Sequence, residues 1–421
     1  MTQSSSSGYI DLLRENANFR YLWFGQIVSL LGDWFNLIAS ASLIASLTGS
    51  GAAVGGLFVV RMLAPFLISP IAGVAADRYN RKHLLIVTDL VRAVIVVGFL
   101  FVREPDDVWM LYVLTALQLG VSGFFFPTRN AILPDLVDRS QLGAANALSS
   151  ATWSVMLALG TALGGLVSGG FGVYPAFAID ALTFLVSAAI IARISYHHAP
   201  GLASTTRGVG RVFRQYADGL GYLKRHRDIF AVTLHKAAVS LFVSGGFQVL
   251  QVVVAEQVYV IGEGGGYSMG LLFAVTGIGT GLGPILARRF TGDRDRALRS
   301  AIVWGYLIGA LGIAVTAPLL GFGVVLIGMF LRGFGGGIVW VFSTQLLLHL
   351  LPDDVRGRVF STEFAMFTLA NALSAAAVGW ALNDTVEGLT QIMWVMAILG
   401  VVPAVLWALW NRGEHIVVEH V

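Results

Sequence analysis

The 421-residue chain contains no cysteine, and this absence excludes several kinds of chemistry at once. Disulfides, thiolate metal sites and cysteine nucleophiles all require a thiol, so none of them can operate here. Charge is also scarce, because only 12% of the residues are Asp, Glu, Lys or Arg, against about 25% in soluble domains. Hydrophobic residues make up 56% of the chain, and the mean hydropathy is +0.76. The composition therefore predicts an integral membrane protein.

Sequence motifs of common hydrolases and nucleotide-driven enzymes are also missing. The chain has no Gly-x-Ser-x-Gly, no His-Glu-x-x-His and no Gly-x-x-x-x-Gly-Lys-Ser/Thr segment. A hydrolase, a transferase or an ATP-driven pump is therefore not favoured, and we expect no enzyme, no cofactor and no metal site. The pI of 9.2 points to nucleic acid only superficially. The basic residues flank the apolar segments, where membrane orientation explains them better.

Long apolar runs are what the chain has in abundance. About 20 apolar residues cross a bilayer, and twelve such runs can be marked. They cover approximately residues 21–47, 52–74, 84–102, 108–126, 144–168, 174–194, 229–255, 268–286, 298–317, 322–348, 360–382 and 389–410. The sequence therefore predicts an all-α integral membrane fold with twelve transmembrane helices.

The basic residues predict how these helices are oriented. Most of the 27 Lys and Arg residues fall in the two termini and in the loops after even-numbered runs, so these segments are expected to be cytoplasmic. The polar, Ser-rich residues before the first run do not resemble a signal peptide. Residues 195–228 alternate basic and apolar side chains, which favours an amphipathic helix on the inner leaflet over a solvated linker. This segment would separate a six-helix bundle at 1–194 from a second one at 229–421.

A carboxylate within the first apolar run is the most informative residue. At mid-helix, Asp33 costs about 2.5 to 3.5 kcal/mol by insertion scales. It belongs to a stripe at steps of three and four residues, which places every member on one helix face: Gln26, Ser29, Asp33, Asn36 and Ser40. Because lipid does not tolerate such a face, we expect it to line a wet cavity rather than to bury a single structural pair.

The seventh run, the counterpart of the first, has a stripe of its own: Lys236, Ser240, Ser244, Gln248 and Gln251. This stripe contains no acid, so the two stripes together predict one titratable site, at Asp33. Other candidates for lining a cavity are Thr115, Gln118, Ser122 and Arg332, with the aromatic residues Trp34, Phe35, Trp153, Phe247 and Trp340. Aromatic surface suits a large, partly apolar ligand. Taken singly, however, each aromatic residue is more often a packing residue.

The remaining charges inside the runs need partners. Asp89 and Arg92 lie three residues apart and can pair with each other. Arg61 and Arg332 are candidate partners for Asp180 or for the carboxylate of the first stripe. We interpret Arg61, Asp89, Arg92 and Asp180 as structural or gating charges.

Two motifs recur in the second half of the chain. Leu-Pro-Asp at 133–135 returns at 351–353, a shift of 218 residues, and Asp-Arg at 77–78 returns at 293–294, a shift of 216 residues. Two nearly equal shifts indicate an internal duplication of six plus six helices. Parallel repeats of this kind form transporters whose substrate lies near the bilayer midplane, between the repeats.

The segment 73–82, Gly-Val-Ala-Ala-Asp-Arg-Tyr-Asn-Arg-Lys, resembles the loop signature of the major facilitator superfamily. Asn80 replaces the usual second Gly, and Asn is among the few residues that tolerate left-handed backbone. In that family the Asp and the basic residues form a charge lock that opens and reforms as the two halves rock. The resemblance implies a gating role for Gly73, Asp77, Arg78, Arg81 and Lys82.

Segments 126–135, 144–148 and 351–359 resemble the efflux branch of this superfamily that contains the enterobactin exporter and macrolide pumps. Residues 160–165 are similar to its antiporter motif, although Thr161 replaces the expected Pro and predicts a straighter helix.

The resemblance implies proton-coupled export of an amphipathic small molecule, such as a drug or a siderophore, by alternating access. Asp33 would carry the proton. The expected partners are substrate, protons and the bilayer of the cell membrane, and we expect a monomer. A passive carrier or importer of the same fold and a nontransporting membrane sensor are the alternatives.

Overall fold

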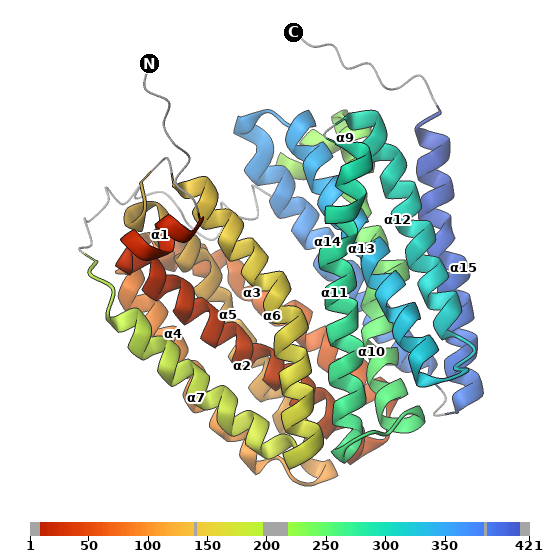
Figure 1. Ribbon diagram of the computed structural model, residues 1–421, viewed down its shortest axis with the longest axis horizontal. Helices are drawn as coiled ribbons and strands as arrows, with labels where there is room; N and C mark the ends of the chain where they lie inside the picture. The colour runs from red at the N-terminus through yellow and green to blue at the C-terminus, as the bar shows by residue number, and fades with distance from the viewer. Residues whose placement is uncertain (1–8, 139–140, 197–217, 293, 383–384, 413–421) are drawn as a thin grey trace. The chain divides into compact units, whose positions relative to one another are not determined.

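The computed structural model describes residues 9–138, 141–196, 218–292, 294–382 and 385–412 (Figure 1). Twelve helical segments in this part of the chain are long and apolar enough to cross a membrane. The predicted all-α fold with twelve spans is therefore confirmed. After a short α1 (Tyr9–Glu15), the spans of the first half are α2 (Ala17–Thr48), α3 (Gly51–Arg78), α4 (Arg81–Gly98), α5 (Val108–Leu136), α6 (Leu142–Phe171) and α7 (Val173–Ala192).

The seventh span is one helical run made of four pieces. They are α9 (Arg227–Val239), the π-helical turn η3 (Ser240–Ser244), α10 (Gly245–Val253) and a second π-helical turn, η4 (Val254–Val258). The remaining spans are α11 (Gly266–Thr291), α12 (Asp295–Thr316), α13 (Phe322–Leu350), α14 (Asp353–Ala381) and α15 (Val386–Trp410). Short 3-10 turns lie at Phe99–Phe101, Pro105–Asp107 and Glu263–Gly265.

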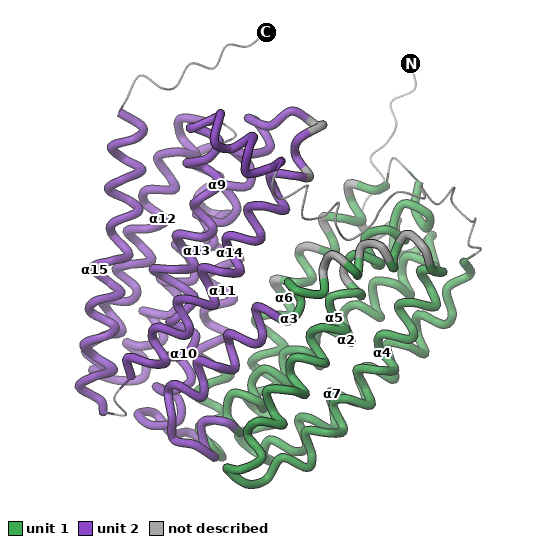
Figure 2. The backbone as a smooth tube through the Cα atoms, turned by 180° about the vertical axis from the view of Figure 1, so that it is seen from behind, with its two compact units in different colours: residues 1–43, 64–209, 262–270 green, residues 44–63, 210–261, 271–421 purple. Residues whose placement is uncertain are grey.

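The chain forms two compact units (Figure 2). Unit 1 contains residues 1–43, 64–209 and 262–270, and unit 2 contains residues 44–63, 210–261 and 271–421. The first part of α3 thus belongs with the second half of the sequence, and the start of α11 with the first half. Most of the predicted linker, residues 197–217, lies outside the described residues, whereas residues 218–225 are helical. The domain boundaries predicted at 194 and 229 stay a prediction.

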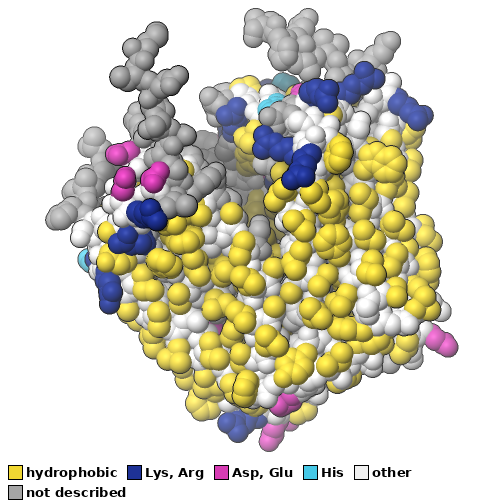
Figure 3. All heavy atoms as spheres, viewed as in Figure 1, with side chains coloured by type: hydrophobic (Ala, Val, Ile, Leu, Met, Phe, Trp, Pro, Cys, Tyr) yellow, Lys and Arg dark blue, Asp and Glu magenta, His cyan; other side chains and the backbone are white. Residues whose placement is uncertain are grey.

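The outer surface of the helices is apolar. Hydrophobic side chains cover the flanks of the helices, and Lys and Arg side chains gather near helix ends (Figure 3). Large apolar side chains on this surface are strongly exposed, for example Val94 (74%), Leu373 (64%) and Ile398 (67%). So much exposed apolar surface is unfavourable in water but matches lipid tails, so the structure agrees with the membrane assignment.

Segment 73–82 is more helical than a loop signature suggests. Helix α3 continues to Arg78, and α4 begins at Arg81, so only two residues separate the helices. Asn80 does not use the left-handed backbone that Asn tolerates, because its φ is −59°. Its side chain instead accepts a hydrogen bond from the backbone N–H of His83 and caps α4. Asn suits this position because it is one of the preferred N-cap residues.

The first π-helical turn of the seventh span has identifiable partners for its backbone. Its wider ring is closed by a bond from the N–H of Gly245 to the carbonyl of Ser240, five residues back. Ser374 of α14 donates to the carbonyl of Leu241 at 2.7 Å and accepts from the N–H of Gly246 at 2.8 Å. Ser244 donates to the carbonyl of Val239 at 3.2 Å. Because no water reaches a lipid-embedded backbone, these side-chain bonds are what make the irregular turn tolerable.

Glycine allows α6 to lie directly against the start of α11 within unit 1. A Cβ on Gly165 would overlap the backbone of Gly266 and Gly270, and a Cβ on Gly270 would overlap Gly165 in turn. Small residues spaced four apart let transmembrane helices approach closely and gain dispersion energy.

We expect Gly165→Ala to destabilise the protein by about 1 to 3 kcal/mol, because the added methyl group overpacks this interface. Gly281→Ala on α11 is the matched control, since no atom lies within 4 Å of its added Cβ, and it should be neutral or stabilising by up to about 1 kcal/mol. Thermal unfolding midpoints in one detergent measure both effects. Equal shifts in the two variants would contradict the packing argument.

Candidate functional site

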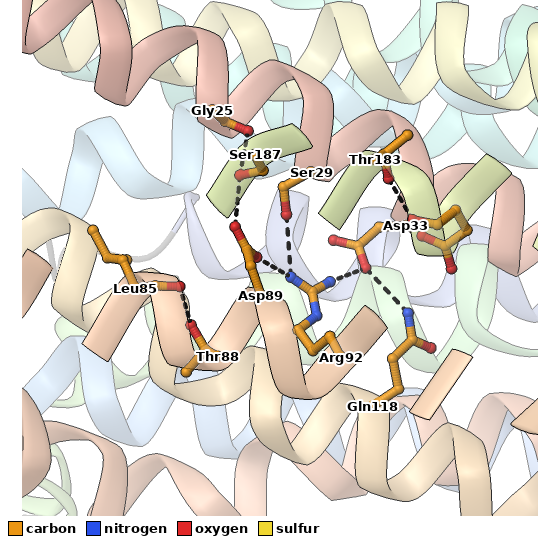
Figure 4. Close-up of polar contacts among 11 residues, drawn as sticks. Gly25, Ser29, Asp33, Leu85, Thr88, Asp89, Arg92, Gln118, Thr183 and Ser187 are labelled. Atoms are coloured by element: carbon orange, nitrogen blue, oxygen red, sulfur yellow. Dashed lines mark hydrogen bonds and ion pairs between the residues drawn. The ribbon is translucent and has the colours of Figure 1, made fainter. Parts of the chain in front are cut away.

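Asp33 on α2 is paired with a buried arginine of α4. The guanidinium of Arg92 donates to the Asp33 carboxylate and to the hydroxyl of Ser29, the latter at 3.1 Å (Figure 4). Gln118 of α5 reaches the same Asp33 oxygen at 3.5 Å. The Arg92 side chain is only 1% exposed, whereas the Asp33 side chain is 20% exposed. The sequence analysis named Arg61 and Arg332 as candidate partners for this carboxylate or for Asp180, and it did not predict the pairing of Asp33 with Arg92.

Arg92 also contacts Asp89, one turn earlier on its own helix, at 3.5 Å. The other oxygen of Asp89 accepts a hydrogen bond from Ser187 of α7 at 2.6 Å, and Ser187 is also 3.1 Å from the carbonyl of Gly25 on α2. The Phe184 ring lies 3.9 Å below the guanidinium carbon of Arg92. Helices α2, α4, α5 and α7 therefore contribute to the contacts of the guanidinium and its carboxylates (Figure 4).

A third carboxylate, that of Asp180 on α7, lies in the same region of unit 1. Asp180 is fully buried and interacts electrostatically with Arg92. Its carboxylate and the hydroxyl of Thr183 occupy the space where Gly32 of α2 has no side chain. Among Asp33, Asp89 and Asp180, only Asp33 keeps a substantial exposed surface, since the other two are 0% exposed.

The other residues of the first stripe point into the helix bundle and are buried. Gln26 is 3% exposed and reaches the Ser149 carbonyl of α6 at 3.4 Å. Asn36 and Ser40 are 0% exposed and bond to each other at 3.1 Å. Thr115 of α5 is likewise fully buried.

Two predicted aromatic residues meet near this stripe. Trp34 of α2 and Trp153 of α6 contact edge to face, with ring centroids 5.9 Å apart. Trp153 is 41% exposed, whereas Phe35 is buried at 4%. Trp153 is thus exposed, and Asp33 and Trp34 are only partly buried.

The second stripe does not act as a single surface. Lys236 and Ser240 bond to α14, through Glu363 at 2.8 Å and Asn371 at 2.8 Å. Gln251, beyond the π-helical turn, instead bonds to α11 and α13. Because a π-helical turn contains an extra residue, the uniform helical spacing assumed for the stripe does not hold across it.

Arg332 of α13 is held by neutral partners. It donates to the carbonyl oxygen of the Gln251 side chain at 2.9 Å and reaches the Thr276 hydroxyl at 3.4 Å. Its guanidinium carbon lies 4.7 Å from the centre of the buried Phe247 ring. Gln248, one turn before Gln251, is partly buried. The contacts of Arg332 are therefore hydrogen bonds and a cation–π contact rather than the acidic partner that the sequence suggested.

Glu363 of α14 is the functional candidate that the sequence analysis missed. It pairs with Lys236 at 2.8 Å and is 2% exposed, so the second half does contain a buried acid. The expectation of a single titratable site was drawn from the two stripes alone and is therefore incomplete. A signal was available in the sequence, because Glu363 stands between aromatic residues in Phe-Ser-Thr-Glu-Phe-Ala-Met-Phe at 360–367.

One predicted gating residue, Arg81, has well-defined partners. Its guanidinium pairs with Asp135 of the Leu-Pro-Asp motif at 2.7 Å and donates to the Ala131 carbonyl at 3.0 Å. Tyr196 donates to the same Asp135 oxygen at 2.9 Å. Burial, and the hydrogen bond to Asp135, raise the pKa of Tyr196, so its hydroxyl remains a donor at neutral pH. The cluster of Arg81, Asp135 and Tyr196 joins α4, α5 and the residues after α7.

The structure describes less of the other predicted gating residues. Gly73, Asp77 and Arg78 lie within α3, and their side chains are outside the described part of the structure, while Lys82 lies in the first turn of α4. In the second copy, Asp293 falls outside the described residues. Asp295 contacts His349 of α13 at 2.7 Å. Within the described residues, no group of three or more His, Cys, Asp or Glu side chains is placed to hold a metal ion.

The sequence model of the protein family called Major Facilitator Superfamily matches residues 22–375, so the chain belongs to this family. An uncharacterised transporter of the family from Bacillus subtilis (strain 168), YfiS, is 27% identical over 374 residues, 87% of each chain. The putative bacilysin exporter BacE of the same organism is 23% identical, over 89% of this chain and 91% of its own. Macrolide efflux protein A of Streptococcus pyogenes is 22% identical, over 84% and 86%. The chain is thus a transporter of this superfamily with relatives of the efflux type.

Solved structures agree on the fold. A bacterial homologue of the human lysosomal transporter Spinster, in an inward-facing and unoccupied conformation, superposes with a TM-score of 0.71 over 94% of this chain and 96% of its own, at 16% identity. The nucleoside transporter NupG superposes with a TM-score of 0.71 over 94% of this chain and 99% of its own, at 11% identity. At such identities the likeness concerns the fold alone.

We expect Arg92→Met to destabilise the protein by about 3 to 5 kcal/mol, because it leaves buried carboxylates without their cation. Asp33→Asn in the same background should restore part of this loss, since one of those carboxylates is then neutral. Arg289→Met, at an exposed position near the end of α11, is the control and should have little effect. Unfolding midpoints of wild type, Arg92→Met, Asp33→Asn, the double variant and Arg289→Met test the prediction, and additive losses in the double variant would argue against the pairing.

Proposed function

We propose that this transporter exports an amphipathic small molecule by alternating access and exchanges it for protons at Asp33. The single observation that supports this best is the uneven exposure of the carboxylates around Arg92. Asp89 and Asp180 are fully buried, whereas Asp33 is 20% exposed while still paired with Arg92. A coupling group must exchange its proton with water and also change the protein when it does so.

Protonation of Asp33 would act through its ion pair. A neutral carboxyl group attracts the guanidinium of Arg92 much less strongly, and the arginine then depends on Asp89 and Ser29. Since these groups belong to α2 and α4, the change in charge alters the free energy of the contact between the two helices. Substrate and proton would exclude each other if the substrate favours the form with Asp33 ionised, which is the requirement for antiport.

The substrate class is proposed from the lining residues and from the relatives. Two relatives carry the names of a bacilysin exporter and a macrolide efflux protein, which supports efflux of a small molecule. Within unit 1, Asp33 with its contact Gln118, and the ring pair Trp34 and Trp153, would offer hydrogen bonds and aromatic surface, as an amphipathic ligand needs. A drug or a siderophore fits this description.

Orientation and setting belong to the same proposal. The charge distribution of the loops supports a multi-pass protein of the cell membrane with both termini in the cytoplasm. We propose that it functions as a monomer, since one chain of this fold contains both six-helix repeats.

Asp33→Asn should abolish gradient-driven accumulation in proteoliposomes while the fold is preserved, because the amide cannot bind and release a proton at neutral pH. Asp106→Asn, an exposed acid in the loop before α5, is the matched control and should transport like wild type. The measurement is the uptake of candidate drugs and siderophores under an imposed pH gradient. Uphill flux at the wild-type level in Asp33→Asn would refute the assignment of the coupling role to Asp33. If wild type itself shows no uphill flux, downhill flux separates a passive carrier from a sensor.

The segment with Asp77, Arg78, Arg81 and Lys82 is proposed to lock the cytoplasmic face in one state. Asp77→Ala should shift the conformational equilibrium by about 1 to 3 kcal/mol, as typical coupling energies do, and lower transport. Asp293→Ala should have a milder effect, because its copy lacks the preceding Gly spacing. Spin labels at the cytoplasmic ends of spans two and eleven report the shift. A distance distribution that Asp77→Ala leaves unchanged would mean that the segment only anchors the topology.

A further inference from the structure

Helix α14 presents an acid in the middle of an aromatic face. Phe360, Glu363, Phe364 and Phe367 follow one another at i, i+3, i+4 and i+7, which places all four on the same side of the helix. The rings of Phe364 and Phe367 are 6.0 Å apart, so the face is continuous. A carboxylate among phenyl rings is a costly arrangement within a membrane unless a cation compensates it.

The cation that now occupies this face is a side chain of the protein itself. The ammonium of Lys236, from α9, lies 2.8 Å from Glu363, 4.8 Å from the centre of the Trp340 ring and 5.7 Å from that of Phe360. Trp340 of α13 in turn packs edge to face on Phe367, at 4.9 Å. One carboxylate and several aromatic rings around an ammonium form the standard recognition site for an organic cation. We call Glu363, Trp340, Phe360 and Phe367 the acid–aromatic box.

The box has spare binding capacity and an open side. Glu363 uses Oε2 for Lys236, while Oε1 is buried and has no hydrogen-bond partner. A buried carboxylate oxygen without a donor is costly, and a ligand that supplies a donor relieves that cost. Trp340 is 38% exposed and the adjoining Phe364 is 47% exposed, so aromatic surface continues outward from the buried acid.

We propose that the acid–aromatic box binds the cationic group of the transported molecule, with Lys236 as an internal competitor that occupies the box in its absence. This inference rests on the proposed export of an amphipathic molecule and specifies that molecule as an organic cation with an apolar body. The cation binds Glu363, and the apolar body lies along Trp340 and Phe364.

The chemistry of the box favours a cation over an anion. Ring faces carry partial negative charge, so they attract an ammonium and repel a carboxylate. A ligand anion aimed at Lys236 would also have to approach Glu363, whose charge is of the same sign. A ligand cation instead meets a carboxylate with a free oxygen. The ammonium of Lys236 already occupies this position, and a competitor that must first leave lowers the apparent affinity of the ligand.

The test is equilibrium binding of ethidium, a permanently charged aromatic cation, to the purified full-length protein in detergent. Lys236→Met removes the competitor and should lower the dissociation constant about tenfold. Glu363→Gln in the Lys236→Met background should raise it by at least tenfold, because a charge-assisted contact is lost. This double variant leaves no unpaired charge in the box, so its folding is not at risk from a buried cation.

The aromatic part of the box is tested separately. Trp340→Leu should weaken ethidium binding about threefold to thirtyfold, and Trp340→Phe less, since an aromatic face is retained. Trp304→Leu, at a 63% exposed tryptophan of α12, is the matched control and should leave binding unchanged. Nile red, an uncharged aromatic dye, should bind the Glu363 and Lys236 variants alike.

Unchanged ethidium affinity on Glu363→Gln in the Lys236→Met background, or equal effects on ethidium and Nile red, would overturn the proposal. Binding at equilibrium needs no gradient, so this outcome is independent of proton coupling. If Asp33→Asn abolishes uphill transport but ethidium binding does not depend on Glu363, the proposed export is supported and the proposed substrate class is refuted. If ethidium binding depends on Glu363 while Asp33→Asn transports normally, the box stands and the coupling site fails.

Discussion

The interaction on which the first unit depends is the contact of Arg92 with its carboxylates in a bilayer-spanning bundle. Removing ions from water costs several kcal/mol each, and their mutual attraction repays this only with good geometry and further hydrogen bonds. Here Ser29, Ser187 and Gln118 supply those bonds, and they come from α2, α7 and α5. The charged centre therefore fixes how these helices meet α4. Protonation of one of these carboxylates would therefore change the contacts of several helices at once, whereas protonation of a solvent-exposed acid would not.

Unit 2 compensates its buried charges with a different ion pair. Lys236 and Glu363 are buried on α9 and α14, and aromatic rings replace most of the hydroxyl groups that surround Arg92. Aromatic faces attract a cation but cannot donate to a carboxylate, so the acid of this pair is the less satisfied partner. The two repeats thus share an architecture while their buried charges differ in chemistry. Under the proposals above, this difference would let the first half handle protons and the second half recognise a ligand.

Hydropathy predicted all twelve spans because the bilayer sets their length, and helical spacing predicted which residues of α2 share a face. Spacing within one helix cannot, however, identify the neighbouring helix, and this is why Arg92 was assigned to Asp89 alone rather than to Asp33. Glu363 was not predicted for a related reason. The comparison of polar stripes covered only the first and seventh spans, whereas Glu363 lies on α14. The N-cap role of Asn80 depended on where α3 ends, and α3 ends four residues beyond the apolar run that predicted it. The positions of Asp33, Lys236 and Arg332 in apolar runs were visible in the sequence, whereas their partners required the packing.

The π-helical turn at Ser240–Ser244 has a consequence for how this helix can be related to others. A π-helical turn holds one residue more than an α-helical turn, so it absorbs a single inserted residue without rotating the helix on either side of it. A homologous helix that lacks the turn would present the same faces above and below while being one residue shorter. Sequence registers on the two sides of Ser240–Ser244 must then differ by one. Residues that occupy equivalent places in space, such as those around Gln251, would appear misaligned unless a gap is placed inside the membrane span.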